Sequence, residues 1–273
     1  MADRENADQR EASSIHERVS AQFGAVAAAY TTSPVHADPQ ALRQVVELAQ
    51  PRAGDRALDI ATGAGHTALA LAPHVAQVVA YDMTQPMLLE TARNAAARGL
   101  ANVTTEQGIA EALPFAEATF DIVTARTAPH HFADIRAATR EMARVAKPGG
   151  RIVIVDSSAP EDPALDRQWN HIEKLRDPSH VRNYTPSEWR AMLAGAGLHV
   201  TFEEASFATE NGGPMDFAAW VRRMNTPPEA VAELSRLFRE ASPSLVAALR
   251  IEIAAGGEIF FCVPLITLAA TKI

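Results

Sequence analysis

An acid and two closely spaced glycines form the part of this sequence whose residue types most clearly suggest chemistry. Asp59 lies near the end of an apolar run, Gly63 and Gly65 follow it, and an alanine-rich stretch begins at Ala68. This order is typical of a buried strand, a tight turn and the start of a helix. Glycines allow a ligand to approach the backbone closely, and the first N–H groups of a helix are unpaired. The pattern therefore predicts a site for a nucleotide-like ligand.

The acids around this turn indicate which ligand it is. A dinucleotide site has a third glycine, whereas here His66, Thr67 and Ala68 follow Gly65. A carboxylate at Asp59 disfavours a pyrophosphate and suits an ammonium group. Asp82 ends the next apolar run, at a spacing where an acid commonly binds ribose hydroxyls. An ammonium group and a ribose together describe S-adenosylmethionine, while an NAD(P)-dependent oxidoreductase and a non-catalytic S-adenosylmethionine-binding protein stay open as alternatives.

Four stretches of the chain resemble the class I S-adenosylmethionine-dependent methyltransferases, and in particular the group of the ubiquinone/menaquinone C-methyltransferases and their small-molecule relatives. In chain order they are LDIATGAGHTALALA, VVAYDMTQPMLLETAR, GIAEALPFAEATFDIVTARTAPHHF and EMARVAKPGGRIVIVDSSAPED. A further segment, EKLRDPSHVRNYTPSEW, is similar to a subgroup of bacterial members. The resemblance implies transfer of a methyl group from S-adenosyl-L-methionine to a small-molecule acceptor. It implies neither the identity of the acceptor nor whether carbon, oxygen, nitrogen or sulfur is methylated.

The resemblance also implies a set of cofactor contacts. Asp59 is expected to accept a hydrogen bond from the cofactor amino group and Asp82 from the ribose hydroxyls. Many relatives have aspartate where Ile109 stands, so adenine binding is expected to rest on apolar packing and on the Ala110 N–H. The full expected set is Tyr30, Asp59, Ala61, Thr62, Gly63, Gly65, Asp82, Met83, Met87, Ile109, Ala110, Glu111, Arg126 and His131.

Two adjacent histidines, His130 and His131, are the candidates for a general base. They follow the predicted fourth strand, whose carboxyl end faces the transferred methyl group in this fold. An imidazole can take up a proton near neutral pH. The alternative is that one of them only binds the cofactor or the backbone. No metal site is predicted, because neighbouring residues diverge and no Cys or carboxylate ligand has a matching spacing.

Aromatic and ionisable residues outside the core pattern are candidates for the acceptor site. We expect His36, Trp169, Arg176 and Tyr184 to contact the acceptor, because aromatic rings and an arginine suit a flat or anionic molecule. Ordinary helix packing and surface ion pairs are the alternative. Tyr30, Ser33 and Pro34 lie where the family's N-terminal segment closes over the cofactor, and Tyr30 is expected to reach its carboxylate.

These residues require a sheet whose strands end at one edge. Short apolar runs near 56–61, 77–82, 102–107, 120–126 and 151–156 alternate with helical patterns, which is typical of a parallel sheet. With two later strands, 198–208 and 258–272, the expected fold is α/β, a Rossmann-like doubly wound seven-stranded mostly parallel sheet with a helical cap. Residues 1–12 are expected to be disordered and 13–273 to form one domain. Its core is 40–157, 185–208 and 258–272, and its cap is 13–36, 158–184 and 209–256.

Composition narrows the class of protein further. The formal net charge of the 273 residues is −8, which argues against a nucleic acid as the main partner because phosphate binding needs a basic surface. No apolar run is long enough to span a bilayer, and the polar start resembles no signal peptide. The single cysteine, Cys262, excludes an intramolecular disulfide. We therefore expect a cytoplasmic enzyme, with homodimer formation left open.

Overall fold

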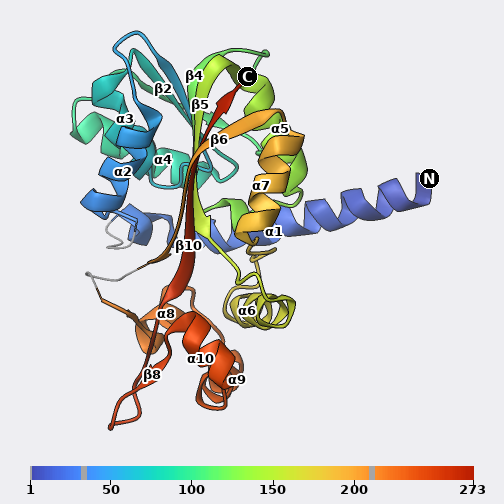
Figure 1. Ribbon diagram of the computed structural model, residues 1–273. Helices are drawn as coiled ribbons and strands as arrows, with labels where there is room; N and C mark the ends of the chain where they lie inside the picture. Colours follow the sequence, from blue (N-terminus) through green and yellow to red (C-terminus); the bar gives the residue numbers. More distant parts are fainter. Residues whose placement is uncertain (1, 32–35, 209–212) are drawn as a thin grey trace.

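A seven-stranded sheet forms the centre of the protein. The structure is a computed structural model that describes residues 2–31, 36–208 and 213–273. Strand order is β3-β2-β1-β4-β5-β10-β6, and β10 runs antiparallel to both of its neighbours (Figure 1). This confirms the predicted doubly wound, mostly parallel sheet. The strands are β1 (Arg56–Ile60), β2 (Gln77–Asp82), β3 (Val103–Gln107), β4 (Phe120–Arg126), β5 (Ala146–Ser157), β6 (Leu198–Ala208) and β10 (Val263–Lys272).

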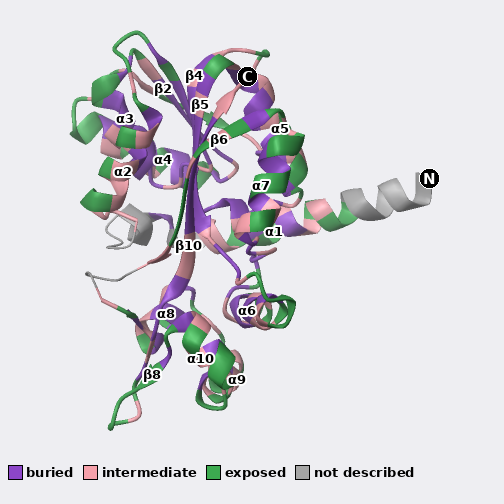
Figure 2. Cartoon of the chain, viewed as in Figure 1, coloured by how far each residue is buried: buried purple, intermediate pink, exposed green. Residues whose placement is uncertain are grey.

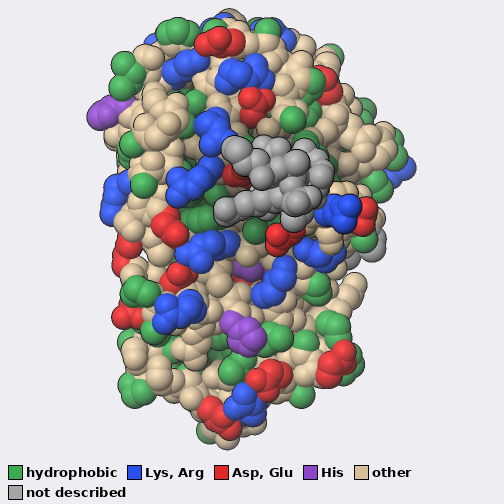
Figure 3. All heavy atoms as spheres, turned by 90° about the vertical axis from the view of Figure 1, so that its right-hand side faces the viewer, with side chains coloured by type: hydrophobic (Ala, Val, Ile, Leu, Met, Phe, Trp, Pro, Cys, Tyr) green, Lys and Arg blue, Asp and Glu red, His purple; other side chains and the backbone are tan. Residues whose placement is uncertain are grey.

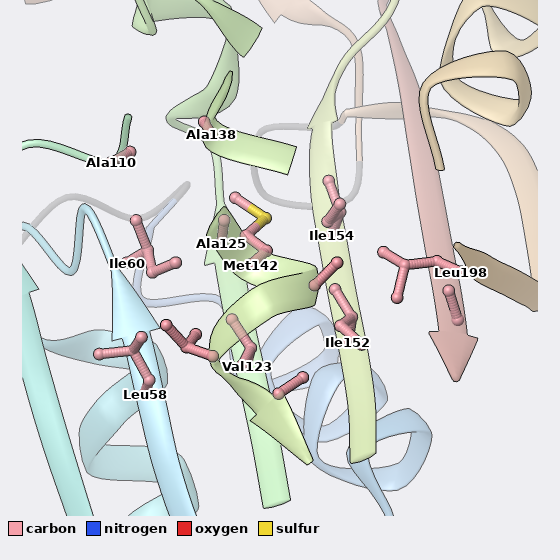
Figure 4. Packing of buried hydrophobic residues seen from close by; sticks show 14 of the residues in the cluster. Leu58, Ile60, Ala110, Val123, Ala125, Ala138, Met142, Ile152, Ile154 and Leu198 are labelled. Carbon is pink, nitrogen blue, oxygen red and sulfur yellow. The ribbon is translucent and has the colours of Figure 1, made fainter. Parts of the chain in front are cut away.

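Helices cover both faces of the sheet because its strands alternate between two apolar surfaces. On one face, α2 (Pro39–Ala49) and α3 (His66–Leu71) pack on residues such as Ala57 and Val78. On the other, α5 (Ile135–Val145) and α7 (Pro186–Gly195) pack on residues such as Leu58 and Ile154 (Figure 4). Figure 2 shows the central strands of the sheet as buried, whereas the edge strands β3 and β6 carry many exposed residues.

Local signals in the sequence set the helix starts. The side chain of Asp38 accepts from the Gln40 N–H and begins α2. Thr185 and Glu188 form a reciprocal capping box at the start of α7, as the sequence predicts. Helix α4 (Gln85–Ala97) starts after Thr84, although the Thr84 side chain makes no capping hydrogen bond.

The N-terminal helix is longer than the sequence predicts. Helix α1 spans Ala2–Thr31, so the expectation of disorder over residues 1–12 does not agree with the structure, which describes residues 2–12 as helix. This stretch is rich in Ala, Glu, Gln and Arg, which are good helix formers. The later part of α1 packs against α4, where Gly24 lies beside Thr84 and Pro86.

The cap has a hydrophobic core of its own. Trp169, Trp220, Phe238 and Phe261 are almost fully buried in this second cluster, which lies below the sheet in Figure 1. A small sheet of order β7-β9-β8 supports it. The cap elements are α6 (Pro163–Arg176), β7 (Met215–Asp216), α8 (Phe217–Arg223), α9 (Pro228–Arg239), α10 (Pro243–Leu249), β8 (Glu252–Ile253) and β9 (Ile259–Phe261).

The predicted strand 258–272 serves both sheets. It is interrupted at Cys262, whose N–H donates to the Leu249 carbonyl at 2.7 Å instead of to a strand neighbour. The chain therefore leaves the small sheet after β9 and enters the large sheet as β10. This passage ties the cap to the core, as the long strand in Figure 1 shows.

The surface carries charges of both signs. On the face presented in Figure 3, Lys and Arg side chains lie among Asp and Glu side chains, so that face offers no continuous basic surface. Among the described residues, no helix combines the length and apolar character needed to cross a membrane.

Candidate active site

The cofactor cavity lies where the strand order reverses. Strand β1 lies between β2 and β4, and ligands in open α/β sheets bind beside the carboxyl ends of strands at this switch point. A cavity of about 900 Å³ opens there. Of the expected cofactor residues it is lined by Asp59, Ala61, Thr62, Gly63, Asp82, Met83, Met87, Ile109, Ala110, Glu111, Arg126 and His131.

Asp59 lies deep in this site and its carboxylate is hydrogen-bonded within the protein. One oxygen accepts from the Thr124 hydroxyl at 2.7 Å, and the other accepts from the Thr62 hydroxyl at 2.6 Å and the Ala68 N–H at 3.1 Å. Burial raises the pKa of Asp59, although the two hydroxyl bonds act in the opposite direction. The carboxylate therefore ties β1 to β4 and to the start of α3, while its predicted contact with the cofactor amino group, direct or through water, stays a prediction.

Asp82 holds the glycine turn from the end of β2. Its carboxylate accepts from the Gly63 N–H at 2.9 Å and from the Thr84 N–H at 2.8 Å. Burial raises the pKa of Asp82 against these hydrogen bonds and one from the Thr84 side chain. Each oxygen accepts one backbone N–H, and the carboxylate keeps lone pairs that can accept from a ribose.

The two glycines of the turn have different roles. Gly63 adopts φ +57, and a Cβ there would meet no atom within 4 Å, so this residue leaves open space beside the cavity. Gly65 adopts φ +88, and a Cβ there would lie 2.8 Å from the Thr91 side chain. Gly65 is not among the residues that line the cavity, and its missing Cβ makes room for Thr91 of α4, while its cofactor contact stays a prediction.

Apolar residues form the end of the cavity assigned to adenine. Met83, Met87, Ile109 and Ala110 all line it, as expected. The Tyr81 hydroxyl donates to the Ile109 carbonyl at 3.2 Å and fixes this segment. The Ala110 N–H has no hydrogen-bond partner among the described residues.

Helix α1 supplies a wall that the sequence reasoning did not resolve into residues. His16, Val19 and Phe23 line the cofactor cavity from one face of this helix. Their spacing of three and four residues is the signal that could have identified them. Glu111 helps to hold this wall, since its carboxylate lies 3.5 Å from His16 Nε2 and accepts from the Ala133 N–H at 2.7 Å.

A second cavity, of about 1370 Å³, adjoins the first between the core and the cap. The wall that the two share consists of Phe23, His36, Arg126, Thr127 and His131. We call the second one the acceptor cavity. A molecule in it would therefore lie next to the cofactor.

His130 lines the acceptor cavity and pairs with a carboxylate that the sequence reasoning missed. Its Nδ1 lies 2.6 Å from Asp156 Oδ1, and the Asp156 side chain is fully buried. Burial acts to lower the pKa of His130, but the charge and hydrogen bond of Asp156 outweigh it, so this pKa is raised above 6.5. Asp156 ends an apolar run, as Asp82 does, and β5 neighbours β4. These two facts were the available signal.

His131 is held as a neutral side chain. Its Nδ1 lies 3.2 Å from the Ser179 carbonyl, and the edge of Phe23 packs on its ring at 4.9 Å. Burial lowers its pKa to about 3, and the neighbouring charge of His130 acts in the same direction. Although its ring lies near those of His130 and His180, no described group of His, Cys, Asp and Glu side chains could hold a metal ion.

The expected acceptor residues separate into two groups. His36 and Arg176 line the acceptor cavity. Trp169 is fully buried in the core of the cap, stacked on Trp220 at 6.4 Å, and Tyr184 packs edge-on against Trp189 at 5.8 Å. Neither lines the cofactor cavity or the acceptor cavity, so the expectation that Trp169 and Tyr184 contact the acceptor does not fit the structure of the described residues.

Three expected residues of the N-terminal segment cannot be placed in the site. Ser33 and Pro34 lie outside the described residues, and so does the side chain of Tyr30. The next described residue that reaches the site is His36, whose carbonyl accepts from Arg126 Nη2 at 2.5 Å.

The residues that are present fit S-adenosylmethionine. Asp82 retains accepting capacity, Gly63 leaves open space, and the Ala110 N–H is unpaired among the described residues. These features provide an acceptor for ribose hydroxyls, room beside the backbone for the methionine part, and a donor for adenine. Arg126 lies in the wall near the methionine end, held by Thr67 and His36.

Comparison with known proteins agrees with this geometry. Residues 58–154 match the model of the family described as "Methyltransferase domain". The uncharacterized methyltransferase YcgJ of Bacillus subtilis is 38% identical over 92% of this chain and 97% of its own. Its crystal structure superimposes with a TM-score of 0.79, over 85% of this chain and 98% of that one.

Two further relatives come from other bacteria. The uncharacterized protein YafE of Escherichia coli is 42% identical over 67% of this chain and 85% of its own. A demethylmenaquinone methyltransferase of Thermus thermophilus is 34% identical over 63% of this chain and 86% of its own. From the site geometry and these similarities we conclude that the chain belongs to the class I S-adenosylmethionine-dependent methyltransferases.

Proposed function

We propose that the protein methylates a small molecule that must lose a proton to react, and that His130, oriented by Asp156, removes this proton. The observation that carries the proposal is the 2.6 Å contact between His130 Nδ1 and Asp156 Oδ1 on the wall of the acceptor cavity. A buried carboxylate at Nδ1 fixes the imidazole orientation and leaves Nε2 as the basic nitrogen.

The surroundings of His130 support this role. Among the described residues, Nε2 of His130 has no hydrogen-bond partner. The backbone is fixed as well, because the His130 carbonyl accepts from the N–H groups of Val181 and Arg182. The Ser157 hydroxyl approaches Nδ1 at 3.3 Å and donates to Asn183. A base must be held within reach of the proton it removes, and these contacts restrict its position.

The cofactor supplies a methyl group that is already activated on a sulfonium sulfur. The protein's part is to align the acceptor, exclude water and take the proton. Asp82 and the Gly63 turn would hold the cofactor. The shared wall, which includes Thr127 and His131, would bring the acceptor beside its methyl end. His131 supports this wall as a neutral residue, whereas His130 takes the proton.

The size and lining of the acceptor cavity suit a small molecule. The cavity lies between the core and the cap, and its lining includes α1 and α6 residues such as Phe23 and Glu173. A nucleic-acid segment would need a basic surface, whereas Asp38, Glu173 and Asp177 lie among the arginines of this lining. We also propose that the protein acts in the cytoplasm, where small-molecule substrates of this kind are available.

Label transfer tests the proposed function. The purified protein is incubated with methyl-labelled S-adenosylmethionine and with a cell extract separated into small-molecule and macromolecular fractions. We expect label to appear in a small-molecule product, and to be reduced at limiting cofactor in an Asp82→Ala control that binds the cofactor more weakly. Label confined to protein or nucleic acid would contradict the small-molecule acceptor, and no transfer to any fraction would favour a non-catalytic cofactor-binding protein.

A further inference from the structure

Arg176, one of the arginines on the acceptor cavity wall, is fixed by three contacts. Arg176 Nη1 donates to Glu173 Oε2 at 3.1 Å, and Nε donates to the Trp220 carbonyl at 3.3 Å. The guanidinium also lies over the Trp220 ring, 4.6 Å from its centroid. Only 14% of the side chain is exposed. Little side-chain entropy remains to be lost when such a group binds a ligand.

Part of the donor capacity of this guanidinium is not used by the described residues. Nε and Nη1 of Arg176 donate to Trp220 and Glu173, whereas Nη2 has no hydrogen-bond partner among the described residues. A fixed guanidinium with an unused nitrogen is suited to donate to an oxyanion.

A second arginine of the cavity wall can also donate to a ligand. Arg126 makes no ion pair with a carboxylate among the described residues, and its bonds go to Thr67 and to a backbone carbonyl. Of the cavity's carboxylates, Asp38 accepts from the Gln40 N–H, and Asp177 accepts from both the N–H and the hydroxyl of Ser179. An anion in the cavity would therefore find guanidinium donors on Arg126 as well as on Arg176.

Part of the acceptor cavity wall is apolar. This part consists of Phe207, Met215, Met224, Val263 and Leu265, which come from β6, the cap and the start of β10, while polar residues such as Gln44 and Ser206 line other parts. These side chains offer no hydrogen bonds and bury apolar surface. The ligand they suit has an apolar body attached to its polar group.

From these contacts we infer that the methyl acceptor is an anion with an apolar body. The body would lie against the apolar wall that includes Phe207 and Val263, and Arg176 would bind its carboxylate, sulfonate or phosphate group. The inference rests on the proposed function, because it takes the second cavity as the acceptor cavity. It assigns Arg176 as the residue that selects anionic acceptors, while His130 acts on the reacting atom.

Binding of a matched pair of probes tests the inference. 2-Naphthoate and 2-naphthamide have the same shape and differ in charge, and calorimetry in the presence of S-adenosylhomocysteine measures each one. We expect the naphthoate to bind about 10-fold or more tightly than the amide, since hydrogen bonds to a charged group are the stronger ones. We expect Arg176→Gln to remove this preference and Arg176→Lys, which keeps the charge without the planar fork, to weaken it about 3-fold.

The matched control is Arg182→Gln. Arg182 is also held by carboxylates, Asp166 and Glu188, and lies over the Tyr184 ring, but it lines neither cavity. We expect this variant to keep the preference for the naphthoate, and melting temperatures confirm folding of each variant. Equal binding of the two probes to the unaltered protein, failure of both to bind, or an undiminished preference in Arg176→Gln would overturn the inference. These binding measurements do not depend on turnover, and we expect His130→Ala to keep the preference for the naphthoate. A wrong assignment of His130 as the base can therefore be distinguished from a wrong assignment of Arg176.

Discussion

The backbone N–H of Gly63 donates to the carboxylate of Asp82 at 2.9 Å, which joins the glycine turn after β1 to the end of β2. Two residues that the sequence predicts to bind different parts of one cofactor thus form a single unit. The acid shapes the turn and keeps accepting capacity for a ribose. Cofactor binding and turn geometry are therefore coupled at this pair.

Replacement of Asp82 by Ala should weaken cofactor binding by about 1.5–3 kcal/mol, because hydrogen bonds to a charged acceptor are lost. Calorimetry with S-adenosylhomocysteine measures the effect. Asp121→Ala is the matched control, since Asp121 also accepts a backbone N–H, from Arg56, but lies outside both cavities. An unchanged dissociation constant for Asp82→Ala would show that this acid does not bind the ribose.

Replacement of Asp59 by Ala should mainly reduce stability. The change leaves two buried hydroxyls and the Ala68 N–H without their acceptor, so we expect a loss of about 3 kcal/mol or more in the free energy of unfolding. Urea unfolding of the protein without cofactor measures it. Unchanged stability together with lost cofactor affinity would instead make Asp59 a direct ligand contact.

Replacement of Ala61 by Gly should stabilise the protein by about 1 kcal/mol. Ala61 adopts φ +52, a left-handed conformation that strains a residue with a Cβ. Ala118 adopts φ +53 outside the site, so Ala118→Gly is the matched control and should give a similar gain. If only the control gains stability, the backbone at Ala61 is not strained in the way its φ indicates.

Methyl transfer should lose activity as the pH falls through the pKa of His130. Asp156 raises that pKa above 6.5, and the protonated imidazole cannot accept a proton. Asp156→Asn removes the charge, so the acidic limb of kcat/KM should move to lower pH while the plateau falls. The pH profiles of both proteins, with Asp121→Asn as control, measure this shift. An acidic limb that stays in place in Asp156→Asn would contradict the pairing.

Much of this arrangement was predictable because it follows from local signals. The strand ends at Asp59 and Asp82 and the glycine turn are set by apolar runs and by backbone conformation, and both acids lie where the pattern predicts. The seven-stranded sheet was predictable for the same reason, since the alternation of strands and helices repeats along the chain.

Long-range packing decided what the sequence could not predict. Trp169 was expected at the acceptor because tryptophan suits flat ligands, but the cap needs a core of its own and buries it there. Gly65 was assigned to the cofactor because spacing alone does not distinguish a ligand contact from the approach of Thr91. Asp156 was missed because its partner His130 is distant in sequence and close only through the β4–β5 pairing.

The rate of methyl transfer by His130→Ala tests the central claim most directly. The assay follows S-adenosylhomocysteine formation with the small-molecule fraction as acceptor, and calorimetry measures cofactor binding by the same proteins. His199→Ala is the control, because His199 is exposed. The account predicts a fall in kcat of about 10²–10⁴ for His130→Ala, with cofactor affinity nearly unchanged and His199→Ala fully active. A His130→Ala protein that keeps its kcat, or that loses activity only in proportion to cofactor binding, would contradict the assignment of His130 as the base.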